Sequence, residues 1–152
     1  MAQRISNIII HCSDSVFGDV NEIRKWHLAR GWREVGYHFV ILNGLIQPNF
    51  FLDALDGSIE AGRYINSDSL LDDNEAGAHT LGYNARSIGI CLVGKKKFTA
   101  KQMNSLLTLV RQLKLRYMIP VKNILGHNET PSGKAEGKTC PNFRVARIRE
   151  QI

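Results

Sequence analysis

Four short, mainly apolar runs, rich in β-branched and aromatic side chains, constrain the fold of this chain more than any other feature. Each run is short enough for one buried strand and closes at a polar residue or a glycine. The runs are Ile8–Ile10, Tyr37–Leu42, Ser87–Val93 and Val121–Gly126. Segments with helical periodicity separate them, and strands that alternate with helices are typical of α/β domains. The sequence therefore predicts an α/β fold in which helices flank a central β-sheet.

The clearest helix signal begins at Thr99. This residue and Gln102, three positions later, have the spacing of a capping box, and Pro120 ends the pattern. Between them an apolar stripe recurs at helical spacing. Its members are Met103, Leu106, Leu107, Val110, Leu113 and Tyr117. A second helix is predicted over residues 21–30, with Gly31 as its stop.

The remaining segments read as turns and loops. Residues 43–57, which contain a proline and two Asn-Gly or Asp-Gly turn signals, predict an irregular excursion. Residues 64–77 are acidic and small, which predicts a solvated loop, and Pro141 predicts the first turn of a terminal helix. The loop carries Asp72, Asp73 and Glu75. We interpret these carboxylates as a hydrated surface turn rather than as the paired acids of a glycosidase.

Length and composition fit a single domain over residues 1–152, without an internal boundary or repeat. A content of 43% hydrophobic and 22% charged residues excludes disordered and low-complexity classes. The 20 Lys and Arg against 14 Asp and Glu give a net charge of +6, which favours an anionic partner such as nucleic acid or a bacterial cell wall. A basic helix and interleaved basic and aromatic residues are both missing, so we expect no nucleic-acid binding.

Compartment and redox state follow from two further patterns. The apolar run near the N-terminus is too short for a signal peptide, and no segment approaches the ~20 apolar residues that cross a bilayer. We expect synthesis in the cytoplasm without a signal peptide, and no membrane insertion. The three cysteines, Cys12, Cys91 and Cys140, are odd in number and widely spaced. They favour a reducing compartment or metal chemistry over a disulfide framework.

Two histidines occupy matching positions at strand ends. His11 follows the first apolar run directly, His127 follows the last, and Cys140 lies 13 residues beyond His127. If the two strands are close in the sheet, two imidazoles and a thiolate come together, a set that binds zinc and leaves a fourth position open. A strand-end histidine that only makes structural hydrogen bonds is the alternative.

Lys138 lies two residues before Cys140, so both side chains point the same way in an extended segment. A lysine beside a metal-bound carbonyl can donate to a developing oxyanion, and a solvated loop lysine is the alternative. Gly137-Lys138-Thr139 also resembles the end of a phosphate-binding loop. The required earlier glycine is absent, since position 132 is a serine, so we exclude nucleotide binding here.

A longer series of motifs resembles the zinc-dependent N-acetylmuramoyl-L-alanine amidases of phage endolysins, a type 2 amidase family that includes the peptidoglycan-recognition proteins. The similarity covers nearly the whole chain in order, and the series is far more specific than any motif in it. The motifs are Glu22–His27, Gly31-Trp32, Gly36–Phe39, Asp56–Arg63, Gly77–Asn84, Ser87–Ile90, Gly126-His127 and Lys138–Pro141.

The resemblance implies a mixed, mostly parallel sheet with a cleft over one edge, and a peptidoglycan hydrolase that cleaves the amide between the lactyl group of N-acetylmuramic acid and L-alanine. It implies one Zn²⁺ per chain, and peptidoglycan or muropeptide as the partner, on the cell wall or its fragments. The residue assignments it carries are His11, His127 and Cys140 for the metal, Tyr37 and Lys138 for catalysis, and His79 and Asn84 for substrate binding.

The chain departs from its relatives at three places. Cytosolic amidases of the family carry a glutamate, able to act as a general base, where this chain has Cys91, so the base stays open. An insertion over residues 43–55 and a long acidic loop before Gly77 are expected to border the cleft or to be inert surface loops. The alternative function is a non-catalytic muropeptide-binding module on the same fold. Such modules typically lose the metal-binding cysteine, so the presence of Cys140 favours an enzyme.

Overall fold

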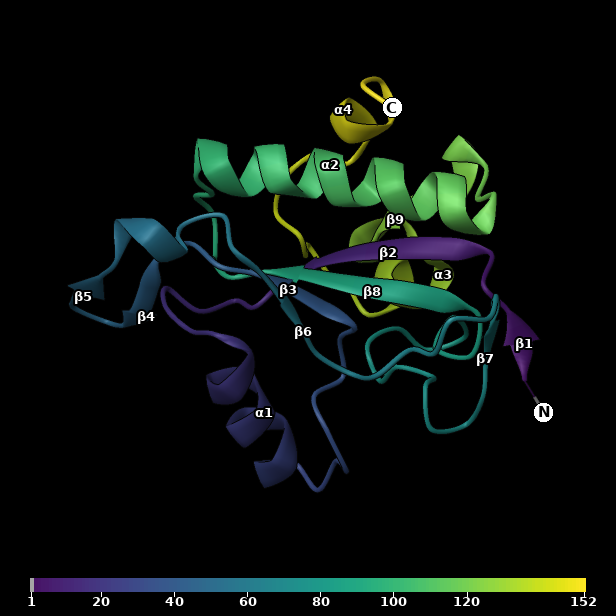
Figure 1. Ribbon diagram of the computed structural model, residues 1–152, viewed down its shortest axis with the longest axis horizontal. Helices are drawn as coiled ribbons and strands as arrows, with labels where there is room; N and C mark the ends of the chain where they lie inside the picture. The colour runs from purple at the N-terminus through teal and green to yellow at the C-terminus, as the bar shows by residue number, and fades with distance from the viewer. Residues whose placement is uncertain (1) are drawn as a thin grey trace.

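A computed structural model describes residues 2–152 and has a five-stranded central sheet (Figure 1). The strands follow the order β6-β3-β8-β2-β9, and β3, β8, β2 and β9 run parallel while β6 pairs antiparallel to β3. This arrangement confirms the predicted mixed, mostly parallel sheet. The strands are β2 (Asn7–Cys12), β3 (Phe39–Ile41), β6 (Ile59–Ala61), β8 (Ser87–Leu92) and β9 (Ile124–Gly126).

The two long helices, α1 (Val20–Ala29) and α2 (Ala100–Tyr117), lie on opposite faces of the sheet (Figure 1). Alternation along the strands explains the separation, since successive side chains point to opposite faces. Ile8 and Ile10 of β2 pack in the same cluster as α2. Cys91 of β8 packs with α1 in a second cluster, and His11 is in register with it. Neighbouring residues of one strand therefore face opposite sides of the sheet: one packs in the core beneath α2, and the next faces the side of α1.

Helix α2 forms where the sequence predicts it. Thr99 Oγ1 accepts the Gln102 backbone N–H at 3.0 Å, and Gln102 Oε1 accepts the Thr99 N–H at 2.9 Å, which completes the capping box. The helix ends at Met118, whose φ of 54° is left-handed. Gln102 is fully buried, and its side-chain amide donates to the carbonyls of Ile41 and Val93, so it joins the helix to the sheet.

Helix α1 begins at Val20, one residue before the predicted start. Asp19 is its N-cap and accepts the Glu22 N–H at 2.8 Å. The helix buries Val20, Ile23 and His27 and gives way to Gly31, which has a φ of 86°.

The excursion after β3 is more regular than the sequence suggests. It contains a small hairpin of β4 (Leu45–Gln47) and β5 (Phe50–Phe51), followed by the 3₁₀ turn η1 (Asp53–Leu55). The hairpin projects from one end of the sheet (Figure 1), and both phenylalanines are about half exposed. The prediction of an irregular segment is therefore wrong for 45–51.

The expectation of a fully solvated acidic loop is also wrong. Within residues 64–77, β7 (Leu70–Leu71) pairs with β1 (Gln3–Arg4), and Leu71 is 1% exposed. Glu75 is 2% exposed, and its carboxylate accepts the backbone N–H groups of Asn66 and Asp72. These hydrogen bonds compensate a buried charge, so Glu75 organises the loop from within, while Asp72 and Asp73 are exposed.

The C-terminal third also differs from expectation. Pro141 does not start a helix, because Asn142 after it has a φ of 68°, and the last helix begins only at Ala146. Likewise, the predicted strand from Val121 starts as a 3₁₀ turn. The elements are η2 (Val121–Asn123), η3 (His127–Glu129), α3 (Pro131–Ala135) and α4 (Ala146–Arg149). Within residues 2–152, no helix is long and apolar enough to cross a bilayer.

Candidate metal centre and cleft

The three predicted metal ligands come together. One ligand atom each from His11, His127 and Cys140 lies within 4.8 Å of the others, and the two imidazole centroids are 4.7 Å apart. Pairing of the strands explains the meeting of the histidines. Ile10 of β2 is in register with Gly126 of β9, so the next residue of each parallel strand emerges at the same edge.

The loop after α3 places Cys140 beside the histidines, where its sulfur contacts the backbone of β2. The Cys12 backbone N–H donates to Cys140 Sγ at 3.0 Å, and the Asn128 N–H donates to the Cys140 carbonyl at 2.9 Å. The hydrogen bond to the Cys12 thiol and burial raise the pKa of Cys140 above its usual range. A thiolate at this position therefore calls for a cation beside it.

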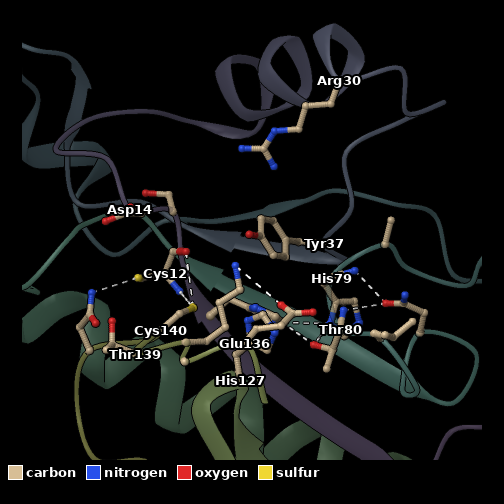
Figure 2. A pocket seen from close by; sticks show the side chains of 18 of the residues that line it. Cys12, Asp14, Arg30, Tyr37, His79, Thr80, His127, Glu136, Thr139 and Cys140 are labelled. Atoms are coloured by element: carbon tan, nitrogen blue, oxygen red, sulfur yellow. Dashed lines mark hydrogen bonds and ion pairs between the residues drawn. The ribbon is translucent and has the colours of Figure 1, made fainter. Parts of the chain in front are cut away.

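A chain of hydrogen bonds behind His11 sets its tautomer, and Figure 2 shows two of its members, His79 and Thr80. Ser87 Oγ donates to the Tyr83 carbonyl at 2.7 Å, so it accepts from His79 Nε2 at 3.3 Å. His79 Nδ1 is then an acceptor, and His11 Nε2–H donates to it at 2.9 Å, with Thr80 Oγ1 at 3.2 Å from the same nitrogen. This leaves Nδ1 of His11 as the free lone pair.

Burial lowers the pKa of both His11 and His79 well below the usual value, and it also lowers that of His127. Neutral imidazole is the form that binds metals. Two neutral imidazoles and one cysteine sulfur are a donor set that suits zinc, and three protein ligands leave one position for substrate or water. The residues at this edge of the sheet therefore fit a catalytic zinc site.

Tyr37 lies beside the cluster, just before β3. Its ring centroid is 5.1 Å from that of His11 and 5.4 Å from that of His27. Burial raises the pKa of Tyr37 well above 10, so the phenol keeps its proton at neutral pH. A protonated phenol at this place is a hydrogen-bond donor toward whatever occupies the cleft.

Lys138 lines the same cleft from the loop before Cys140. Its side chain is 48% exposed, and Nζ is 3.9 Å from the Glu136 carboxylate. It is close enough to His127 to contribute, after burial, to the lowered pKa of that imidazole.

His79 and Asn84, predicted to bind substrate, both line the cleft. Each also makes hydrogen bonds within the protein. His79 Nδ1 accepts the Nε2–H of His11, and Asn84 Oδ1 accepts the backbone N–H groups of His79 and Thr80, both at 2.8 Å. Their substrate-binding role stays a prediction.

Cys91 occupies the place beside His11 in the neighbouring strand, with which it is in register. It is fully buried, and burial raises the pKa of its thiol well above the usual value. A buried neutral thiol is a poor proton acceptor, so Cys91 does not replace the carboxylate found in some relatives. The carboxylates that line the cleft are Asp14 and Glu136.

The cleft around these residues has a volume of about 830 Å³. Sequence reasoning did not assign a role to several residues in its walls. These are Asp14, Arg30, Trp32, Thr80 and Glu136. Trp32 and Thr80 lie within the motifs that carry the family resemblance and Arg30 lies beside one of them, which was the available signal, whereas Asp14 and Glu136 lie outside these motifs.

Comparison with known proteins agrees with this geometry. A family model described as N-acetylmuramoyl-L-alanine amidase (Amidase_2) matches residues 1–143. The endolysin of Klebsiella phage KP32 is 35% identical, over 95% of this chain and 85% of the relative. The endolysin of Escherichia phage T7 is 36% identical, over 92% of this chain and 82% of the relative.

Solved structures share the fold. The N-acetylmuramoyl-L-alanine amidase LysC from Clostridium intestinale superposes with a TM-score of 0.74 at 26% identity, covering 99% of this chain and 89% of its own. Drosophila peptidoglycan-recognition protein LB gives a TM-score of 0.67 at 24% identity, covering 97% of this chain and 84% of its own. The second likeness concerns the fold alone.

Proposed function

The chain belongs to the N-acetylmuramoyl-L-alanine amidase family, and from this premise we propose that it is a zinc-dependent peptidoglycan hydrolase. The bond cleaved is the amide between the lactyl group of N-acetylmuramic acid and L-alanine, in the cell wall or in its fragments. The observation that carries the proposal is the meeting of His11, His127 and Cys140 in the wall of an open cleft.

Zinc, when bound, supplies Lewis acidity at the carbonyl to be cleaved and lowers the pKa of water. The chain itself supplies the binding and hydrogen-bonding groups. The hydrogen bond that His11 donates to His79 orients the His11 imidazole, and the backbone N–H of Cys12 orients the Cys140 sulfur. Amide hydrolysis places negative charge on the carbonyl oxygen. The Tyr37 hydroxyl and the Lys138 ammonium both line the cleft, and we assign to them the donation to that oxygen.

Lys138→Ala tests this division of roles. We expect it to retain one zinc per chain and to lose on the order of 10²–10³ in kcat, because it removes one oxyanion donor. Zinc content and steady-state turnover measure the two effects separately. Loss of zinc from this variant would instead make Lys138 a structural support of the Cys140 loop.

A non-catalytic muropeptide-binding module on the same fold is the competing proposal. Such a module needs no metal ligands, whereas all three are present and adjacent here. The ligand cluster therefore favours catalysis over binding alone.

Digestion of purified peptidoglycan tests the proposed function. We expect the wild type to release new alanine amino groups without new reducing sugar ends. Cys140→Ser and prior chelation should each abolish the release, while the matched thiol variant Cys91→Ala should retain its zinc. Release of reducing ends would identify a glycosidase, and binding of peptidoglycan without any release would identify the binding module.

A further inference from the structure

We propose that Arg30 is a specificity residue, which binds a carboxylate of the stem peptide in the amidase substrate. The inference rests on the proposed function and names one feature that the substrate must have. It starts from the position of Arg30, the C-cap residue of α1. Figure 2 shows its side chain extending from the end of that helix toward Tyr37, and it lines the same cleft as Lys138.

Among the residues that the structure describes, the guanidinium of Arg30 has no partner of opposite charge. Within residues 2–152 its side chain makes no hydrogen bond or ion pair, and it lies over the ring of Trp32, whose centroid is 5.5 Å from Cζ. The other cation of the cleft, Lys138, faces Glu136 at 3.9 Å. Arg30 is therefore the cleft cation that is available to an incoming anion.

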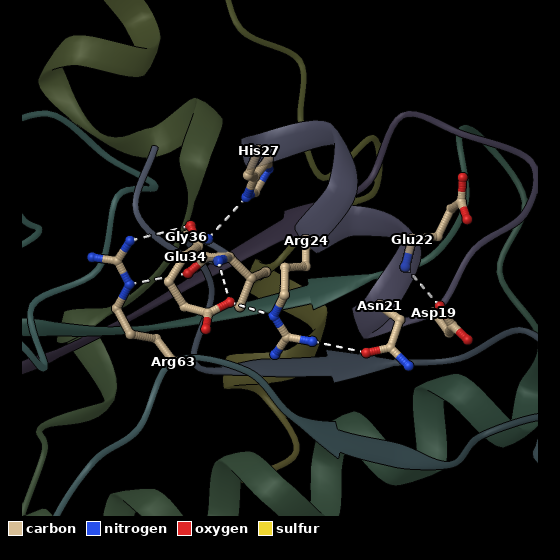
Figure 3. A network of polar contacts seen from close by, with 9 residues as sticks. Asp19, Asn21, Glu22, Arg24, His27, Glu34, Gly36 and Arg63 are labelled. Carbon is tan, nitrogen blue, oxygen red and sulfur yellow. Dashed lines mark hydrogen bonds and ion pairs between the residues drawn. The ribbon is translucent and has the colours of Figure 1, made fainter. Parts of the chain in front are cut away.

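The segment that carries Arg30 is fixed in place from both ends. Figure 3 shows two contacts that hold it. The Gly36 N–H donates to His27 Nδ1 at 2.8 Å, and Glu34 pairs with Arg24 of α1. An anchored backbone loses less conformational entropy when its side chain binds a ligand.

The chemistry of the substrate class decides which anion fits. In a muropeptide the lactyl carboxyl is already part of the amide to be cleaved, and the acetylated sugars are neutral. The remaining anionic groups are the free carboxylates of the stem peptide. A guanidinium is a planar fork of donors that matches a carboxylate in two parallel hydrogen bonds. The cleft therefore selects stem peptides with a free carboxylate within reach of Arg30.

Substrates that differ only in charge test the inference. The probes are a muramoyl tripeptide with free carboxylates and its derivatives in which one carboxylate at a time is converted to the carboxamide. In the wild type, we expect one of these conversions to lower kcat/KM roughly tenfold, mainly through KM, because a charge-assisted hydrogen bond is lost. In Arg30→Ala the ratio between acid and amide should fall to near one, and Arg30→Lys should give an intermediate ratio.

Lys25→Ala is the matched control, since Lys25 lies on the same helix but pairs with Glu22 away from the cleft. It should keep the wild-type ratio. The inference is wrong if Arg30→Ala discriminates between acid and amide as the wild type does, or if the wild type does not discriminate at all. In both cases cleavage of the substrates leaves the proposed function standing. A wild type that cleaves none of these substrates, nor intact peptidoglycan, would refute the proposed function itself.

Discussion

At the scale of single residues, His79 is a hydrogen-bond partner that orients the predicted metal ligand His11. Its Nδ1 accepts the Nε2–H of His11 and so presents the other nitrogen to the cluster. We expect His79→Ala to weaken zinc binding by about 10–100-fold, as loss of such partners does in other sites. His79→Asn, which keeps an acceptor near the position of Nδ1, should recover part of the affinity.

Competition with a chromophoric chelator measures this affinity directly and does not depend on turnover. An unchanged zinc affinity in His79→Ala would show that His11 is oriented by β2 alone. A loss of turnover at unchanged zinc affinity would instead support the substrate-binding role predicted from the sequence.

His38 makes stability depend on pH. It is 1% exposed, its Nδ1 accepts the Gly89 N–H at 3.0 Å, and its Nε2 donates to the Glu75 carbonyl at 2.7 Å. Burial lowers the pKa of His38 to about 4, from the usual 6.5. Between these values the unfolded chain binds the proton and the folded chain does not, so stability present above pH 6.5 is lost as pH falls toward 4. The full contribution is about 3 kcal/mol.

Guanidinium unfolding at pH 7 and pH 5 checks the sign. The wild type should be less stable at pH 5 than at pH 7. His38→Gln should be less stable than the wild type at pH 7, but its free energy of unfolding should fall less between the two pH values. An equal loss in both proteins would assign the pH dependence to other groups, such as His27, whose pKa burial also lowers to about 4.

Residue-level prediction from the sequence succeeded where a side chain follows directly from a strand end. The proximity of His11 and His127 was predicted in this way, because parallel neighbours present their last residues at one edge, while their role as metal ligands stays a prediction. Arg30 and Glu75 were missed. Arg30 lies beside a family motif, but as one of 20 Lys and Arg residues it carries no pattern that separates it from the others. The burial of Glu75 depends on backbone N–H groups that only the folded loop supplies.

At the scale of elements, helix α2 illustrates a locally coded structure. Thr99 caps it, and its hydroxyl also donates to Asp56 at 2.6 Å. We expect Thr99→Ala to reduce the free energy of unfolding by about 1 kcal/mol, through loss of the cap. Thr99→Ser keeps the hydroxyl oxygen, and its free energy of unfolding should be close to that of the wild type. Urea titration of the wild type and both variants measures these values. An equal loss in both variants would point to the lost methyl group rather than to the cap.

Elements that depend on distant partners were predicted less well. The capping box and apolar stripe of α2 lie within 19 residues, so the sequence alone locates them. The two-residue strand β7 exists because β1, at the other end of the chain, pairs with it. Pro141 has the features of a helix start, but the path of the chain around Cys140 delays that start to Ala146.

At the scale of the whole molecule, metal binding and folding should be linked. His11 lies near the start of the sequence, whereas His127 and Cys140 lie more than 100 residues further along the chain, so the three predicted ligands are close only in the folded state. We expect chelation to lower Tm. The corresponding stability is about 4 kcal/mol when free zinc exceeds its Kd a thousandfold. Cys140→Ser should show a smaller shift in calorimetry with and without chelator, and an equal shift would place the ion elsewhere.

The order of the strands in the sheet illustrates what local patterns leave open. Alternating strands and helices predicted the class of fold, whereas the mostly parallel arrangement followed from the family resemblance. The central strand β2 pairs with β8 and β9, which lie about 80 and 115 residues further along the chain. No local pattern near Ile8–Ile10 specifies such partners.

Strand β2 has one further consequence, for anyone who wishes to engineer this protein. Ile10 packs in the hydrophobic core beneath α2. The next residue, His11, points to the opposite face of the sheet and is part of the candidate metal site. A substitution that improves packing by shifting this strand also displaces His11, a predicted metal ligand. Mutant libraries for higher thermal stability should therefore leave β2 unchanged and vary the outer face of α2 and the projecting hairpin. Stabilising substitutions there do not displace the residues of the candidate site.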